Sequence, residues 1–229
     1  IDVLWMIMFF VFIEILFGHT AAIAGWTRGE MYLLVIYWLV LDDLNTIFFA
    51  KIDAIPDIVT DGKLDTYITK PASALFLLTL NFNIKSIYRL MGDLMAVVWI
   101  VYWFNTTPTL WHAAIGIALL LFGLIVTYSI RLIINTLSFW FLRIENVNDL
   151  FYSALSLSEY PIDIFPKTIR IILLTLIPVG LTAYVPAATA VGRWPWYGVL
   201  YAIGFSVMLF ILAVKFWNFA VKRYSSASS

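Results

Sequence analysis

The chain contains no cysteine and only two histidines, so several kinds of chemistry are excluded at once. Without cysteine there is no disulfide, no thiolate nucleophile and no cysteine-ligated metal. His19 and His112 fall at the edges of predicted loops, where we interpret them as interfacial polar residues rather than as metal ligands or proton carriers. We therefore predict no metal or cofactor site in this chain.

The chain also lacks the sequence motifs by which enzymes bind nucleotides or catalytic zinc. It has no GxxxxGK[ST] loop, no HExxH pair and no glycine-rich turn that joins a strand to a helix. We predict that it is not an enzyme, that it cannot hydrolyse ATP by itself and that it has no nucleic-acid partner.

Charged residues are scarce, at 12% of the chain, whereas hydrophobic residues make up 63% and the mean hydropathy is +0.95. A soluble domain of 229 residues cannot bury that much apolar surface with so few charges. Several apolar runs reach the ~20 residues that a membrane helix requires. The composition predicts an all-α integral membrane protein that contacts the lipid bilayer.

Six apolar segments are predicted to cross the membrane and to form one transmembrane domain over residues 1–229. The predicted spans cover residues 1–17, 31–50, 87–104, 110–141, 169–191 and 197–219. A short amphipathic helix is predicted near residues 150–155, before the fifth span. Because the sequence begins at Ile1 inside an apolar run, we expect an N-terminal cytoplasmic segment to be missing from it.

Six spans place both termini on one side of the membrane, and the basic residues indicate which side. Ten of the fourteen basic residues, Lys167 and Arg170 among them, fall in segments assigned to the side of the C-terminal tail. Only Arg28 and Arg193 fall in segments assigned to the other side, which carries five tryptophans: Trp26, Trp103, Trp111, Trp194 and Trp196. Both patterns predict cytoplasmic N- and C-termini.

Residues 51–71, KIDAIPDIVTDGKLDTYITKP, form a polar island between two apolar blocks. Pro56 suits the first turn of a helix, Asp53 could cap that helix, and Gly62 could end it. Apolar residues would share one face of this helix, and Asp57 and Asp61 would occupy the other.

We interpret the polar island as a short amphipathic helix at which a soluble protein docks. Lipid headgroups prefer Lys and Arg, whereas acids outnumber bases on this helix, so a plain loop on the headgroups is the weaker alternative. The candidate docking residues are Asp53, Ile55, Pro56, Asp57, Ile58, Asp61, Gly62, Lys63, Leu64, Asp65, Tyr67, Lys70 and Pro71.

Three separated blocks resemble the permeases of ABC-2 type exporters. In the polar island, Gly62, Leu64 and Asp65 match a G-x-L-D pattern, and Lys70 and Pro71 match the K/R-P that follows it. A second block, EYPIDIFPKTIRIILLTLIPVGLTAYVPA, resembles the family's Y-P-x-x-x-F-P, P-V-G and Y-x-P-A patterns, and the tail RYSSASS resembles its C-terminal end. The likeness extends over nearly the whole chain.

The resemblance implies a division of labour in a bacterial inner membrane. Two permeases, identical or paired with a sister chain, would form the translocation pathway as a dimer. Two cytoplasmic ATP-binding subunits would hold ATP and magnesium, and the polar island would be the coupling helix that docks on them. Two other functions stay open: an ion- or proton-coupled transporter or channel, and a non-transporting membrane scaffold.

Five charged residues lie in or near the predicted spans: Glu14, Asp42, Asp43, Asp93 and Arg131. An ionised group at that depth costs ~3 kcal/mol or more unless it is paired or hydrated. Arg131 therefore needs a partner, and Asp42, Asp43 and Asp93 are the candidates. The pair would be structural or, alternatively, part of a polar pathway or gate.

Prolines interrupt one of the predicted spans, and small residues mark a packing face on two others. Pro178, Gly180 and Pro186 break the helical hydrogen bonds of the fifth span, which predicts a kinked or re-entrant segment at the pathway or dimer seam. A plain proline kink against a neighbouring helix is the alternative. Small residues on the fourth and sixth spans indicate close helix approach within one subunit: Gly116, Gly123, Gly198, Ala202 and Ser206.

Overall fold

The computed structural model describes residues 2–104, 108–141 and 145–224 of the chain. Within these ranges every regular element is a helix, and the one β-type contact is an isolated bridge between Ile23 and Trp26. The all-helical prediction is therefore confirmed for the described residues.

The helices follow the predicted order, with several short elements between the long ones. The elements are α1 Asp2–Phe17, α2 Arg28–Phe49, η1 Ala50–Ala54, α3 Ile55–Thr60, α4 Asp65–Ile68, α5 Ala74–Thr79, α6 Ile84–Trp103, α7 Leu110–Thr136, η2 Leu137–Phe139, α8 Glu145–Leu155, η3 Ser156–Glu159, η4 Ile162–Ile164, α9 Lys167–Thr175, η5 Pro178–Leu181, α10 Tyr184–Ala190 and α11 Trp196–Arg223.

Among the described residues, three helical stretches are long and apolar enough to cross a membrane. They cover Arg28–Thr60, Leu110–Phe139 and Trp196–Arg223, which are 33, 30 and 28 residues long. At a rise of 1.5 Å per residue, each exceeds the ~30 Å of a hydrocarbon core. The number of six spans stays a prediction, because α6 and α1 do not meet the same criteria of length and composition.

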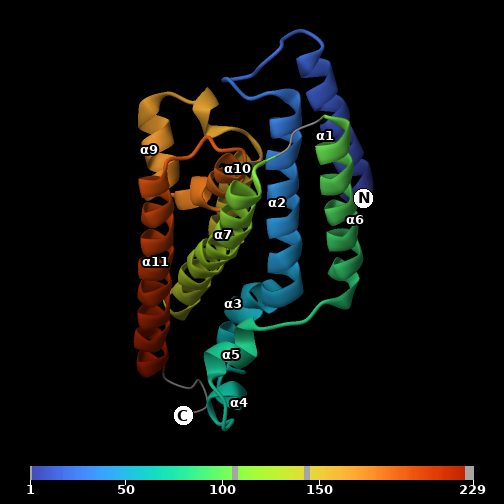
Figure 1. Cartoon of the computed structure of the whole chain (residues 1–229). Coiled ribbons are helices and arrows are strands. Elements are labelled where there is room, and N and C mark those ends of the chain that lie inside the picture. The colour runs from blue at the N-terminus through green and yellow to red at the C-terminus, as the bar shows by residue number, and fades with distance from the viewer. Residues whose placement is uncertain (1, 105–107, 142–144, 225–229) are drawn as a thin grey trace.

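The long helices form an elongated bundle with α2 and α7 at its centre (Figure 1). α11 packs along α7 on one side, and α6 and α1 pack against α2 on the other. α3, α4 and α5 lie together at one end, which we call the island end, and α11 also ends there. The opposite end, where α11 begins at Trp196, we call the far end.

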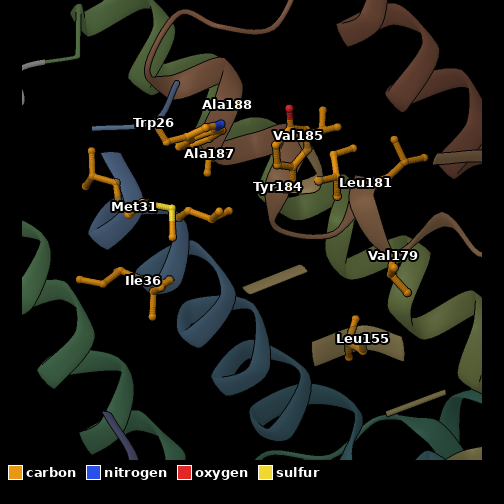
Figure 2. Close-up of a cluster of buried hydrophobic side chains, with 14 of the residues drawn as sticks. Trp26, Met31, Ile36, Leu155, Val179, Leu181, Tyr184, Val185, Ala187 and Ala188 are labelled. Carbon is orange, nitrogen blue, oxygen red and sulfur yellow. The ribbon is translucent and has the colours of Figure 1, made fainter. Parts of the chain in front are cut away.

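The largest apolar core lies in the far half of the bundle (Figure 2). Met31 and Ile36 of α2 belong to this cluster together with Tyr184 and Val185 of α10, and Trp26 joins it from the loop before α2. All five side chains are at most 3% exposed. Because Trp26 is fully buried, it contributes to this core, whereas Trp103, Trp111 and Trp196 are more than two-thirds exposed, as expected for an aromatic belt.

The region predicted as the fifth span, residues 169–191, is three short elements rather than one crossing helix. α9 ends at Thr175, η5 begins at Pro178, and α10 follows at Tyr184. The break lies where Pro178 and Gly180 predict it, because proline has no N–H for the helical ladder. Both helices lie in the far half, where α10 packs on α7 and the Leu174 carbonyl accepts from the Tyr201 hydroxyl.

Residues 145–164 instead extend along the bundle from one end to the other. At the island end, Asn148 donates to the side-chain oxygen of Asn135 at 3.0 Å. At the far end, the Asp163 carboxylate accepts from the indole of Trp26 at 2.9 Å. The amphipathic helix predicted near residues 150–155 is the C-terminal half of α8, the first part of this stretch.

This arrangement corrects the side assigned to two basic residues. Arg170 forms an ion pair with Asp163 at 3.3 Å, so it lies at the far end with Trp26 and not at the island end with Lys63. Lys167 begins the same helix, α9. Both residues were assigned to the wrong end of the bundle because residues 145–164 were not recognised as a segment that runs from one end to the other.

Glycines allow α7 to approach the segment around α10 at backbone distance. A Cβ on Gly123 would overlap the backbone of Thr182, and one on Gly116 would lie 2.8 Å from the Pro186 carbonyl oxygen. On α11, Ala202 and Ser206 are also buried within the chain. The prediction of close helix approach within one subunit is therefore confirmed for Gly116 and Gly123, whereas Gly198 leaves room for the side chain of Trp194.

We expect Gly123→Ala to lower the apparent melting temperature of the purified protein in detergent. The added methyl group collides with rigid backbone at Thr182, and such overpacking costs about 1–3 kcal/mol. Gly204→Ala on α11 is the matched control, because among the described atoms none lies within 4 Å of its added Cβ. Equal melting temperatures for the two variants would contradict the close approach.

Candidate functional site

The polar island folds as a compact extension of α2. α2 continues through η1 into α3, and Pro56 lies in the first turn of α3. Gly62 ends the turn with φ +69°, and the N–H of Lys63 donates to the Ile58 carbonyl at 2.9 Å. A positive φ at this point favours glycine, so the predicted roles of Pro56 and Gly62 are confirmed.

Asp53 does not cap α3, contrary to prediction. The residue before α3 is Ala54, and no described side chain caps this helix. The Asp53 carboxylate instead accepts hydrogen bonds from Arg131 at 2.6 Å, from the Tyr152 hydroxyl at 2.8 Å and from Asn135 at 3.3 Å. Asp53 therefore joins the polar island to α7 and α8.

Arg131 is the buried partner in this cluster, with 5% of its side chain exposed against 38% for Asp53. Its guanidinium also donates to the Phe49 carbonyl at 3.3 Å, at the end of α2. The prediction that its partner would be Asp42, Asp43 or Asp93 is wrong. Hydropathy placed Asp53 outside the membrane, whereas η1 turns its side chain back toward α7.

The other predicted intramembrane acids are distributed over separate places. Asp43 pairs with Arg89 of α6 at 2.8 Å, and Asp93 lies beside Asp43. Glu14 pairs with Arg28 at 3.1 Å and accepts from Tyr32 at the far end. Glu14 therefore lies apart from the other four charged residues, because Asp42 lies within electrostatic reach of Asp93 and lines the same pocket as Arg131.

The apolar side of the polar island is buried in the chain itself. Ile52, Ile55 and Leu64 are fully buried in a cluster with Leu132 and Trp217. This side is therefore not available to a soluble partner. These contacts pack the island against α7 and α11.

The polar side of the island is open to solvent. Exposed side chains include Asp57, Asp61, Lys63, Lys70 and Pro71. Lys63 pairs with Asp61 at 2.7 Å, and this hydrogen bond raises the pKa of the Lys63 amine. Lys70 lies 5.1 Å from the ring centre of Tyr67.

The remaining residues of the docking list support this surface from within. Asp65 lies in the first turn of α4, where a carboxylate favours the helix start. Ile58 is partly buried against the same apolar cluster. Any partner at this end therefore meets the acidic and basic side chains of α3 and the turn that follows it.

A second polar cluster, at the far end, was missed by the sequence reasoning. Asp163 accepts from Trp26 and from the Tyr184 hydroxyl at 2.6 Å, and Arg193 pairs with Glu30 at 2.7 Å. These contacts join the loop before α2 to η4, α10 and the turn before α11. The sequence carried little signal for them, because the partners lie up to 163 residues apart.

The interrupted segment is packed within the chain. Pro178 and Gly180 of η5 and Pro186 of α10 are all buried. A Cβ on Gly180 would lie 3.0 Å from the Leu173 carbonyl oxygen, so η5 folds tightly back on α9. A role at a pathway or dimer seam stays a prediction.

A family model described as ABC-2 family transporter protein matches residues 3–228. The chain belongs to the ABC-2 family of transporter proteins. The resemblance inferred from the polar island and the second block is thereby confirmed. No curated protein and no solved structure matches the chain.

Membership of the ABC-2 family and the three long apolar helices indicate a multi-pass membrane transport protein. In this ABC-2 protein the clearest functional candidate is the polar island. It lies beyond the end of α2, its polar side is exposed, and an ion pair between the partly exposed Asp53 and the buried Arg131 joins it to the bundle.

We expect Asp53→Ala to destabilise the protein more than Arg131→Met does. Removing Asp53 leaves a guanidinium that is 5% exposed without its carboxylate, and uncompensated buried charges cost about 3–5 kcal/mol. Removing Arg131 leaves a carboxylate that water can reach. Apparent melting temperatures of both variants and of the double variant, which should recover most of the loss, measure the difference.

The Lys63–Asp61 pair is the control, since both side chains are more than half exposed. Breaking it with Lys63→Ala should leave the melting temperature close to that of the wild type, because solvent screens an exposed pair. If Asp53→Ala had the same melting temperature as Lys63→Ala, the Asp53–Arg131 pair would not be what holds the island against the bundle.

Proposed function

We propose that this ABC-2 protein is the membrane-spanning permease subunit of an ATP-binding cassette exporter. It would form the translocation pathway as a dimer with an identical or related permease. Separate ATP-binding subunits would hold ATP and magnesium and supply the energy. Family membership supports the transport function, and the sequence carries no nucleotide-binding motif of its own.

The observation that carries the proposal is that the polar island is packed against the bundle on one side and exposed to solvent on the other. Asp57 of α3 and Asp61, which follows its last residue, are exposed to solvent, while Ile52 and Ile55 are fully buried against the bundle. A partner that moves this polar side moves a body already packed on α7 and α11. The island therefore has the properties required of a coupling helix: an exposed docking surface and a rigid connection to the spans.

The connection runs through Asp53 to two crossing segments. Its carboxylate contacts Arg131 on α7 and Tyr152 on α8, within one hydrogen-bonded cluster. Displacing α3 without moving α7 would separate the buried Arg131 guanidinium from Asp53, which is costly because it leaves a buried charge without its partner. Movement of the island is thus expected to displace α7 and α8 together with it.

We infer that the island end faces the cytoplasm of a bacterium, in the inner membrane. Moving Lys167 and Arg170 to the far end changes the predicted distribution of basic residues from ten against two to eight against four. The excess still lies at the island end, as the positive-inside rule requires. Six crossings then include residues 145–164 as the fifth, with both termini inside.

We expect the double charge reversal Asp57→Arg/Asp61→Arg to abolish transport that depends on the partner. Both side chains are exposed, so the substitution changes the docking surface without opening the core. The ATP-binding protein that copurifies with the chain should be lost. ATP hydrolysis by the complex in vesicles should fall to the level of the free ATP-binding protein.

Lys167→Glu is the matched control, because it reverses an exposed charge at the far end. It should retain the ATP-binding protein and its activity. Full transport by the permease alone in vesicles, or labelling of a cysteine at residue 63 only from outside the cell, would contradict the proposal.

A further inference from the structure

An apolar groove lies in the island half of the bundle, where α9 no longer covers α7. Its volume is about 430 Å³, and its lining comes from α7, α8, α11 and the residues that join α9 to η5. Because α9 ends at Thr175, it leaves the space between α8 and α11 open toward the island end. The groove is therefore a consequence of the interruption within residues 169–191.

The lining of the groove is almost entirely hydrocarbon. Phe151 belongs to its floor and is 5% exposed, whereas Leu150 and Leu176 belong to its rim and are 71% and 77% exposed. Among the described residues of the lining, Thr175 alone is polar, and its hydroxyl donates to the Ile171 carbonyl at 2.7 Å. The groove therefore favours an apolar occupant, which in a membrane protein is a lipid chain or another protein segment.

The dimensions of the groove distinguish a lipid chain from a protein helix. An α-helix with its side chains is at least ~10 Å across and rises about 5.4 Å per turn, so one turn occupies ~420 Å³. A groove of about 430 Å³ thus holds no more than one turn of a helix. Non-helical backbone is excluded as well, because its N–H and C=O groups would face an apolar lining. A hydrocarbon chain meets neither restriction.

A stripe of side chains on α11 leads from the groove to the island end of the bundle. The stripe consists of Phe205, Leu209, Phe216, Phe219 and Arg223, and its first two residues line the groove. Arg223 follows Phe205 by 18 residues, which is five turns at ~3.6 residues per turn, so both lie on the same face of the helix. A chain that leaves the groove along this stripe therefore meets a guanidinium.

The length of the stripe fits a phospholipid. Arg223 lies 14 residues beyond Leu209, which is ~21 Å of helix. Half the thickness of a bilayer with its headgroups is about 20–22 Å. A headgroup at Arg223 therefore places the end of its acyl chain at Leu209, in the groove.

Arg223 has the chemistry that an anionic headgroup requires. Its guanidinium lies 4.2 Å from the ring centre of Phe219, which keeps it over the stripe. No acid among the described residues forms an ion pair with it. A guanidinium binds phosphate through two parallel N–H donors, and a basic side chain at a membrane surface attracts anionic lipid by ~1 kcal/mol. The charge at the end of the stripe thus complements a phosphate.

We propose that the groove holds one acyl chain of an anionic phospholipid whose phosphate is bound by Arg223. The lipid belongs to the leaflet at the island end. It fills the space that α9 leaves open and joins α8 to α11 through apolar contacts. Its binding requires neither nucleotide nor an ATP-binding subunit.

Native mass spectrometry of the full-length protein in detergent tests the proposal. Long-chain phosphatidylglycerol should bind saturably, with one lipid per chain, and more tightly than phosphatidylcholine with the same acyl chains. Short-chain phosphatidylglycerol has the same headgroup but cannot reach the groove. It should bind at least about tenfold more weakly, since each buried methylene contributes ~0.8 kcal/mol.

Three variants separate the headgroup site from the groove. Arg223→Gln should raise the dissociation constant of long-chain phosphatidylglycerol about fivefold, the equivalent of ~1 kcal/mol, and remove the preference over phosphatidylcholine. Lys222→Gln is the matched control, because it removes the same charge about 100° round the helix, and it should bind as the wild type does. Ala154→Phe places a ring in the groove and should abolish the advantage of long chains, with the melting temperature in lipid-free detergent retained.

Three results would overturn the proposal. Equal binding of long-chain and short-chain phosphatidylglycerol to the wild type would show that the groove does not hold the acyl chain. Equal effects of Arg223→Gln and Lys222→Gln would show that the lipid senses only the overall charge at the end of α11. A dimer that carries no lipid would show that a second copy of the chain covers the groove.

Discussion

The buried guanidinium of Arg131 is the constraint on which the island half of the molecule depends. A full positive charge well inside α7 is costly in an apolar environment unless an acid compensates it. The compensating acid, Asp53, lies beyond the end of α2, in the first residues of the polar island. The cost of leaving Arg131 alone therefore fixes where a short external segment sits against the bundle.

The apolar contacts and the polar contacts of the island have complementary roles. Ile52, Ile55 and Leu64 bury the inner side of the island against α7 and α11, which supplies most of the free energy of packing. The Asp53 cluster supplies direction, because hydrogen bonds restrict the position of α3 along α7. Together they leave the charged side of α3 as the only part of that helix open to a partner.

The far half of the bundle is held by different means. Gly116 and Gly123 bring α7 to backbone distance from α10 and Thr182, and the Asp163 cluster joins Trp26 to α10. The two halves meet along α2 and α7. A change at Asp53 therefore acts where the polar island joins the long helices.

The sequence was sufficient for features that depend on local chemistry. The positions of α2, α7 and α11 follow from long apolar runs, and Pro56 and Gly62 mark the turn of the island through their own backbone preferences. Family membership also followed from local motifs, because Gly62, Asp65 and the second block are contiguous in sequence.

Features that depend on contacts between distant residues could not be predicted in the same way. Residues 145–164 are rich in Asn, Ser and acids because part of this stretch makes polar contacts with Asn135 and Asp53, so hydropathy did not mark it as a segment that runs the length of the bundle. Residues 169–191 are apolar because they pack against the core of the far half. The partner of Arg131 was missed because the polarity of Asp53 was interpreted as exposure to water.

The most direct test of the account is a distance measurement between the polar island and α7. The chain has no cysteine, so spin labels on cysteines at residues 57 and 121, both exposed in the wild type, report one distance only. Double electron–electron resonance should give a single narrow distance distribution for the otherwise wild-type protein. The distance distribution should become broad once Asp53→Asn removes the charge. A broad distribution from the start, or one that Asp53→Asn leaves narrow and unshifted, would contradict the claim that this ion pair holds the island on the bundle.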